Sequence, residues 1–234
     1  MNLFTIASLT VHLWLAELLD FALDEQALLA LLSPDEVKRA MRFKLPLHSQ
    51  RFIITRGLLR KTLSLYTGVA PDKIVFNYGE HGKPHLQANP YALQFNVSHS
   101  ADIAIFALTT YQEIGVDIEK IEPHFREDVA KRFFSSQEYA QLMDLTGDAR
   151  NKGFYQIWSR KEALIKAAGK GLFTLSSDFS INLSETKESV SLMYAEQQVN
   201  YYIENIYVPD GYQAAIATTE PINNISNYSA VFLP

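Results

Sequence analysis

Apolar residues recur along the chain with a helical period in some stretches and a two-residue period in others. The first part is predicted to hold strands over 3–15, 93–97 and 103–108, and helices over 24–32, from Ser33 onward, and over 49–66. The second part is predicted to hold strands over 114–119, 178–183, 190–194, 199–208 and 212–218, and helices over 125–134, 135–145 and 152–170, the last closing on Gly169 and Gly171. Short turns separate the strands between 93 and 119, which predicts an antiparallel meander.

The start of a helix repeats within the chain. Ser33 and Glu36 form a Ser-x-x-Glu capping pattern, and Ser135 and Glu138 repeat it 102 residues later. A long helical pattern follows each of them. The repetition predicts two similar halves of about 110 residues, a normal domain size. A ligand site is expected at the junction of the halves.

The charge pattern excludes several classes of function. The chain of 234 residues has no cysteine and a net charge of −5. Disulfides, thiolate zinc sites and a cysteine nucleophile are therefore excluded, and a protein that coats nucleic acid would be basic. The apolar N-terminus lacks the cationic region of a signal peptide, and no apolar run reaches about 18 residues. These features predict a cytoplasmic protein with no membrane span and no nucleic-acid partner.

Two carboxylates share one face of a predicted strand. In Gly115–Glu119, the alternation of side chains places Asp117 and Glu119 on one side and the apolar residues on the other. Two adjacent carboxylates repel each other unless a cation joins them. A solvent-exposed strand edge explains the same pattern, so the strand alone leaves both interpretations open.

A helical stripe adds a third carboxylate. Trp158, Glu162 and Lys166 are spaced by four residues and therefore lie on one face of a helix. An ion pair between Glu162 and Lys166 beside a buried tryptophan explains either charge alone. It does not explain the acidic strand and the helix together.

Three segments, in this order, resemble the signature motifs of the Sfp-type 4′-phosphopantetheinyl transferases. They are Phe95–Ser100 (FNVSHS), Gly115–Glu119 (GVDIE) and Trp158–Lys166 (WSRKEALIK), and Lys131–Ser135 (KRFFS) is similar to the family segment before the last motif. The resemblance covers nearly the whole chain and is firmest over 75–172. It implies an α+β monomer built as a pseudo-two-fold pair of subdomains, 1–110 and 111–234. Each has an antiparallel-rich sheet packed by helices, with the active site in the cleft between them.

The family resemblance also implies a reaction. The 4′-phosphopantetheine moiety of coenzyme A would pass to a serine hydroxyl of an apo acyl- or peptidyl-carrier protein, releasing adenosine 3′,5′-bisphosphate. Asp117, Glu119 and Glu162 would hold Mg²⁺, and Mn²⁺ would substitute because all the ligands are oxygens. Glu162 would also act as the base, directly or through a metal-bound water. Lys166 would steady or protonate the leaving phosphate.

Further positions match family contacts to coenzyme A. Arg51, Ser98 and His99 match residues at the nucleotide and its 3′-phosphate, Lys83 matches another contact near the nucleotide, and Lys161 matches a residue near the phosphates. One departure is that Glu36 stands where the family carries a cation. Arg39 keeps a later cation of the same helix, so Arg51 is the preferred phosphate contact.

The carrier is expected to dock on 122–140, where Arg126, Lys131 and Arg132 would attract an acidic partner; a solvated helix face is the plainer interpretation. Fatty-acid, polyketide and peptide-synthetase carriers all stay open.

The sequence leaves two other functions as alternatives. One is a metal-dependent phosphohydrolase that uses the same carboxylates and in which water replaces the serine; the other is a carrier-binding module without activity. A serine hydrolase based on Ser98 and His99 is disfavoured, because adjacent residues of a strand point to opposite faces.

Overall fold

The computed structural model describes residues 4–170, 179–194 and 197–233. Its elements, in chain order, are β1 (Thr10–Glu17), η1 (Leu18–Asp24), α1 (Glu25–Leu29), α2 (Pro34–Ala40), α3 (Pro46–Thr67), η2 (Pro71–Lys73), β2 (Phe76–Tyr78), β3 (Pro84–Leu86), β4 (Leu93–Ser100), β5 (Ile103–Thr110), β6 (Ile114–Lys120), α4 (Glu127–Phe133), α5 (Ser136–Met143), α6 (Gly147–Ala167), β7 (Lys187–Tyr194), β8 (Gln197–Asn205), β9 (Tyr212–Thr218), β10 (Asn224–Ser229) and η3 (Ala230–Phe232). None of the helices described is long and apolar enough to cross a membrane.

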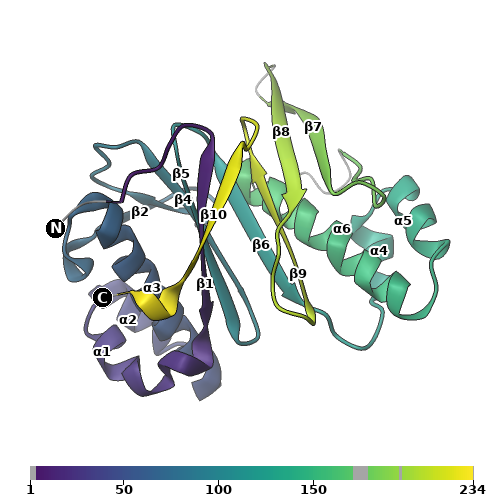
Figure 1. The fold of residues 1–234 in the computed structure, drawn as a ribbon. Helices are drawn as coiled ribbons and strands as arrows, with labels where there is room; N and C mark the ends of the chain where they lie inside the picture. The colour runs from purple at the N-terminus through teal and green to yellow at the C-terminus, as the bar shows by residue number, and fades with distance from the viewer. Residues whose placement is uncertain (1–3, 171–178, 195–196, 234) are drawn as a thin grey trace.

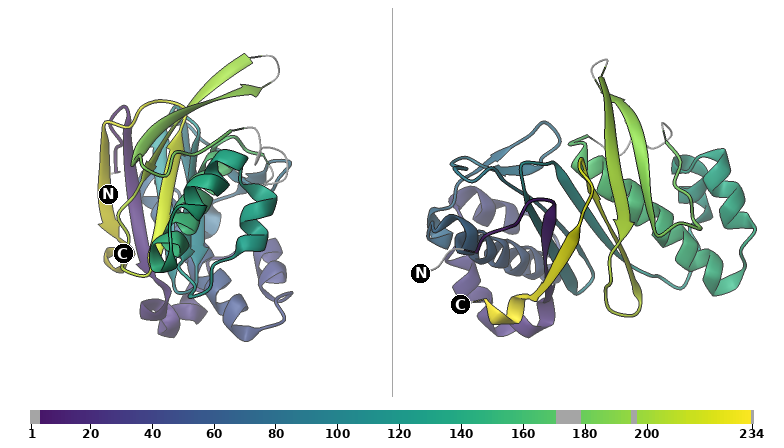
Figure 2. Two further views of the ribbon diagram at one scale, coloured as in Figure 1. Left: turned by 90° about the vertical axis from the view of Figure 1, so that its right-hand side faces the viewer. Right: turned by 45° about the horizontal axis from the view of Figure 1, so that its top comes forward.

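Two halves with related layouts lie side by side, each with a long helix on the outer side of its sheet (Figure 1). The first sheet has the order β10-β1-β5-β4 and carries α3; the second has the order β6-β9-β8-β7 and carries α6. Within each half, the first strand pairs antiparallel with a later one, β1 with β5 and β6 with β9. The α+β class with two subdomains is thus confirmed (Figure 2).

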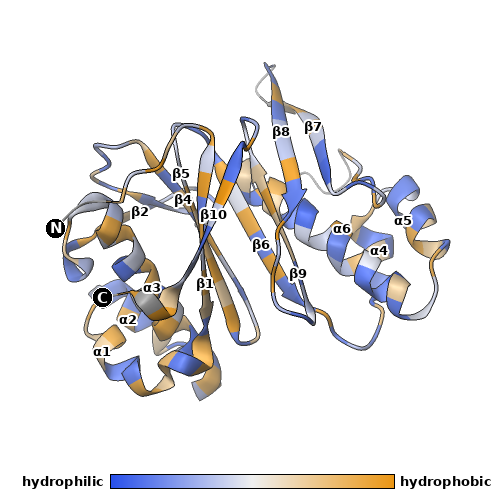
Figure 3. Ribbon diagram, in the orientation of Figure 1, coloured by the Kyte–Doolittle hydropathy of each residue, from blue (hydrophilic) through white to orange (hydrophobic). Residues whose placement is uncertain are grey.

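Three apolar clusters hold these layers together. One lies between α3 and the first sheet, and a second lies between α6 and the second sheet. The third joins the facing strands of the two sheets and includes Val11, Ile105, Val116 and Ile216, all fully buried. Figure 3 shows the matching apolar colour along the strands where the halves meet. Because strands β5 and β6 have apolar residues on buried faces, the halves share one continuous interior.

The structure corrects several sequence-based expectations. The predicted meander is wrong at its third strand: β4 and β5 form a hairpin, but β6 joins the other sheet. The reason is that β5 is an inner strand whose two edges are occupied by β1 and β4. The first strand begins at Thr10, and α6 begins at Gly147 rather than 152. Residues 179–183 are not a strand, whereas residue 178 and Gly171 lie outside the described residues.

The last strand was missed. β10 pairs in parallel with β1, so the C-terminal end of the chain returns to the first sheet. The 110/111 division falls in the connection between β5 and β6, and it remains a prediction as a domain boundary. In space, β10 departs from that division because it is built into the first half (Figure 1).

Candidate active site

Strands β4 and β6 meet at the seam between the two halves through side chains instead of a backbone ladder. Three polar side chains of β4 accept backbone N–H groups of β6, at alternate positions that share one face. The pairs are Asn96 Oδ1 with Val116 N (3.0 Å), Ser98 Oγ with Ile118 N (3.4 Å) and Ser100 Oγ with Lys120 N (3.0 Å). The Asn-x-Ser-x-Ser alternation of β4 is the sequence signal for this contact, and the predictions from the sequence did not include it. The seam fixes which residues of β4 face the carboxylates of β6.

A glycine lets the strand with these carboxylates approach α6 very closely. A Cβ atom on Gly115 would lie 2.0 Å from the carbonyl oxygen of Ala163 and 2.3 Å from the backbone nitrogen of Ala167. Glycine within a strand often marks such a backbone approach. The missing side chain therefore brings β6 and its acidic residues against the helix that carries Glu162 and Lys166.

Asp117 is the most enclosed of the three carboxylates at the seam, with only 3% of its surface exposed. Its Oδ1 atom accepts hydrogen bonds from Lys166 Nζ at 2.7 Å and from Ser98 Oγ at 2.9 Å. Its Oδ2 atom is buried and has no partner among the described residues. Burial raises the pKa of Asp117, while Lys166 and Ser98 oppose that rise. An orphaned, buried carboxylate oxygen is costly unless another group binds it.

Glu119 lies two residues further along the same face. Ser100 donates to its Oε2 atom at 3.0 Å, and the Trp158 indole donates to its Oε1 atom at 3.2 Å. Burial, and then the charge of Asp117, raises its pKa to about 7. Its two oxygens are therefore held from both halves, one by β4 and the other by α6.

Glu162 and Lys166 lie on the face of α6 that looks onto β6. Burial is the main cause of the raised pKa of Glu162. No hydrogen bond or ion pair binds its carboxylate within the part of the chain described. Burial by itself would lower the pKa of Lys166, but Asp117 and then Glu162 outweigh it and raise the pKa. Lys166 thus stays charged among three carboxylates.

The carboxylates suit a divalent cation by their chemistry, but their arrangement is not that of a formed metal centre. Across residues 4–170, 179–194 and 197–233, no three His, Asp or Glu side chains converge as an ion site. The positive charge beside Asp117 is instead the ammonium of Lys166. An all-oxygen set with one orphaned oxygen and raised pKa values fits a hard cation such as Mg²⁺.

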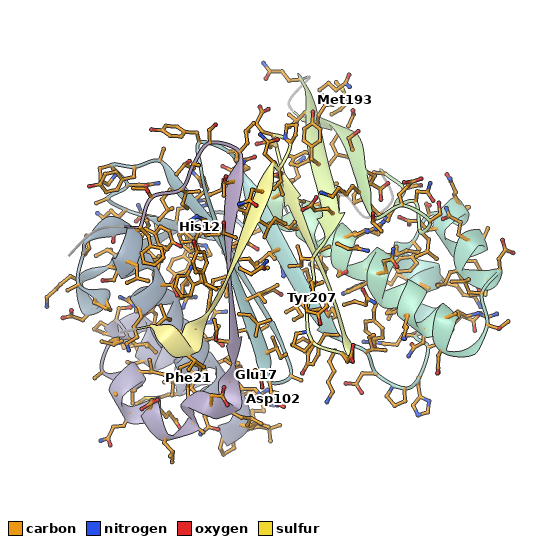
Figure 4. All side chains as sticks on the ribbon, in the orientation of Figure 1. His12, Glu17, Phe21, Asp102, Met193 and Tyr207 are labelled. Atoms are coloured by element: carbon orange, nitrogen blue, oxygen red, sulfur yellow. The ribbon has the colours of Figure 1, made fainter. Side chains whose placement is uncertain are left out.

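Four of the predicted coenzyme A contacts lie around this seam. Ser98 is part of the Asp117 network, and His99 is exposed next to it. Loss of solvation lowers the pKa of His99, and the nearby charges of Lys166, Arg51 and His48 add to that effect. Arg51 pairs with Asp102 at 2.6 Å. Asp102 lies at the turn that follows β4 (Figure 4). Lys83 pairs with Glu113 at 2.8 Å and donates to the carbonyl of Ile114, where β6 begins.

The structure does not bring Lys161 to this cluster. Its side chain is 2% exposed, and its ammonium donates hydrogen bonds to both oxygens of Glu138 at 2.9 Å and to the carbonyl of Phe179 at 3.1 Å. These partners lie in the interior of the second half, so the Lys161 ammonium points away from the seam and its carboxylates. Glu36, the departure noted above, is likewise buried and pairs with Arg60 at 2.7 Å.

Comparisons with known proteins match both halves of the chain. Residues 22–111 match a family model described as 4′-phosphopantetheinyl transferase, N-terminal, and residues 113–217 match the 4′-phosphopantetheinyl transferase superfamily. The chain is 40% identical over 186 residues to the 4′-phosphopantetheinyl transferase HetI of Nostoc sp. (strain PCC 7120), covering 78% of each chain. It is 33% identical over 198 residues to the 4′-phosphopantetheinyl transferase Sfp of Bacillus subtilis (strain 168), covering 85% of this chain and 87% of that one.

A vertebrate relative extends the likeness. The L-aminoadipate-semialdehyde dehydrogenase-phosphopantetheinyl transferase of Xenopus laevis is 28% identical over 207 residues. The matches span both halves and all three motifs, and they confirm the resemblance inferred from those motifs and the expectation of a transferase. The chain belongs to the 4′-phosphopantetheinyl transferase superfamily.

Proposed function

We propose that this transferase moves the 4′-phosphopantetheine moiety of coenzyme A to a serine hydroxyl of an apo acyl- or peptidyl-carrier protein, with release of adenosine 3′,5′-bisphosphate. The observation that carries the proposal is the orphaned, buried Oδ2 atom of Asp117, whose other oxygen pairs with Lys166. Burial, and in addition the charge of Asp117, raises the pKa of both Glu119 and Glu162. Asp117, Glu119 and Glu162 would hold Mg²⁺, for which Mn²⁺ would substitute. The bound ion would neutralise the charge on the pyrophosphate.

Glu162 is the best candidate for the base. Its raised pKa makes it a stronger base than an exposed carboxylate, and no described residue occupies its oxygens. A base is most effective when its pKa lies near the working pH. Glu162 would therefore accept the proton of the carrier serine as that oxygen bonds to phosphorus and the bond to the bisphosphate breaks.

Lys166 would act through its charge. Its pKa is raised, so it keeps its proton at neutral pH and is suited to stabilise the departing phosphate. Arg51, Lys83, Ser98 and His99 surround the same seam and would hold the nucleotide. In the protein alone Arg51 and Lys83 are paired with acids, so nucleotide binding would replace Asp102 and Glu113 as their partners.

The test is the intact mass of an apo carrier protein after incubation with this chain, coenzyme A and Mg²⁺. We expect a gain of one phosphopantetheine mass, which chelator abolishes. Glu162→Gln keeps the shape of the side chain and should abolish the gain as well. Breakdown of coenzyme A with an unmodified carrier would instead indicate a hydrolase. We also propose that the protein is a cytoplasmic monomer, which light scattering and cell fractionation can check.

A further inference from the structure

The connection between α2 and α3 has an unusual composition for a chain with a net charge of −5. No Asp or Glu occurs between Glu36 and Asp72. Within this stretch, residues 38–47 read KRAMRFKLPL, in which four cations alternate with four large apolar residues. We call residues 38–47, the connection together with the last residues of α2 and the first of α3, the basic apolar loop.

The apolar side chains of this loop face solvent. Met41, Phe43, Leu45 and Leu47 are 77%, 40%, 57% and 46% exposed. Large apolar residues gathered on a monomer surface commonly mark a site of interaction. The segment is anchored at its base, because Ser49 Oγ donates to the carbonyl of Ala40 at 3.0 Å. It is therefore a held surface that exposes apolar side chains.

The cations of the loop are not neutralised by neighbours. Lys38, Arg42 and Lys44 form no ion pair within the described part of the chain, and Arg39 only stacks over the ring of Phe52. Segment 122–140, the docking site expected from the sequence, is different. It contains four acids as well as three cations, and Lys131 is paired with Glu127 at 2.7 Å. The local excess of positive charge lies in the basic apolar loop.

The loop also lies next to the proposed site. It leads directly into α3, whose Arg51 pairs with Asp102 at 2.6 Å. Asp102 follows Ser100 by two residues, and Ser100 donates to Glu119 at 3.0 Å. A short chain of contacts therefore links the loop to the seam.

We propose that the basic apolar loop docks the protein that carries the acceptor serine, recognised as an acidic surface with exposed apolar side chains. This inference rests on the proposed function. Charge complementarity favours an acidic partner, since positive patches speed encounter with negative ones. A protein fits better than the nucleotide, because four exposed apolar side chains, from a turn and the start of α3, offer more apolar surface than one adenine base can cover. The surface of a helix in a partner protein can cover them.

The test separates the loop's apolar and charged parts. One variant combines Met41→Ser with Phe43→Ser, and a second combines Arg42→Glu with Lys44→Glu; all four side chains are exposed. Because the Phe43 ring also lies 5.6 Å from the ring of Phe52, urea unfolding of each variant checks that the fold is kept. The matched control is Lys131→Glu with Arg132→Glu. Initial rates give kcat and KM for an apo carrier and, separately, for coenzyme A, each at low and high salt.

We expect each loop variant to lower kcat/KM for the carrier about tenfold, with KM for coenzyme A unchanged. The charge variant should also lose most of its salt dependence. The control should change the carrier's kcat/KM less than twofold. A raised KM for coenzyme A with an unchanged carrier KM would overturn the proposal and assign the loop to the nucleotide. A loss confined to the control would return docking to 122–140.

Calorimetry keeps the docking inference separate from the proposed reaction. Binding of a carrier whose acceptor serine is replaced by alanine needs no transfer. If wild type binds it and the loop variants do not, the docking surface stands even if no product forms. Equal binding by all variants would overturn it.

Discussion

Replacing Gly115 by alanine tests whether the close approach of β6 and α6 builds the site. The new Cβ would meet the Ala163 carbonyl oxygen at 2.0 Å, whereas ordinary contact begins at 3.4 Å. Strand and helix must therefore separate by about 1.4 Å. Neither partner is a flexible side chain, because both close contacts are to helix backbone.

The magnitude follows from that displacement. Overpacking in a core costs about 1–3 kcal/mol, and contacts with the rigid backbone of α6 place Gly115→Ala near the upper end, about 3 kcal/mol. Activity should fall more than stability suggests, since a shift of about 1 Å in a reacting group reduces rates about 100-fold. The reason is that Glu162 and Lys166 move with the helix away from Asp117.

Gly153→Ala in the same helix is the matched control. Its Cβ would contact only side-chain atoms of Leu145, Leu142 and Leu183, at 3.0–3.2 Å. These can adjust, and alanine favours a helix by about 1 kcal/mol. Urea unfolding and the kcat for carrier modification should separate the two variants. If Gly115→Ala matched Gly153→Ala in unfolding midpoint and in kcat, the close approach would have no role in holding the site.

Three further predictions concern charges. Lys161→Met should lower the free energy of unfolding in urea by about 3–5 kcal/mol, because it leaves the buried carboxylate of Glu138 without its cation. The KM for coenzyme A should stay unchanged, and a raised KM without lost stability would contradict this prediction. The pKa of Glu119 is raised to about 7 from 4.5, so the fold favours its protonated form, and stability falls as the pH rises between those values. In metal-free buffer at pH 8, Glu119→Gln should therefore raise the free energy of unfolding above that of wild type by up to about 3 kcal/mol. At pH 4 the variant and the wild type should have the same free energy of unfolding, and a gain of equal size at both pH values would contradict the assignment. Lys166→Met should destabilise the protein by about 3 kcal/mol, but by much less when Asp117 is already replaced by asparagine. This double-mutant cycle is measured by urea unfolding, and additive losses would show that the two side chains do not interact.

The fold was predictable where its signals are local. Helices α3 and α6 have long periodic patterns, and the two capping boxes, of Ser33 and Ser135, both occur in the structure. Strand β10 could not be predicted, because the polar segment Asn224–Ser229 gains its order from pairing with β1 at the other end of the chain. The placement of β6 has the same cause. Its nearest neighbour in sequence, β5, already has a partner on each edge, and no local pattern reveals that.

Within the site, the same helical geometry that predicted the stripe of Glu162 and Lys166 argues against Lys161. Positions five apart on an α-helix point about 140° away from each other, so Lys161 and Lys166 cannot both face the strand with the carboxylates. Matching to a family motif assigns both lysines to the ligand, because it treats positions one by one. The structure turns Lys161 inward to Glu138, and the first half repeats the arrangement with Glu36 and Arg60. In both halves, the glutamate of a capping box binds a cation of the long helix. The repeat that suggested two similar halves therefore marks a shared core contact, and the chemistry belongs to the face of α6 that this contact leaves free.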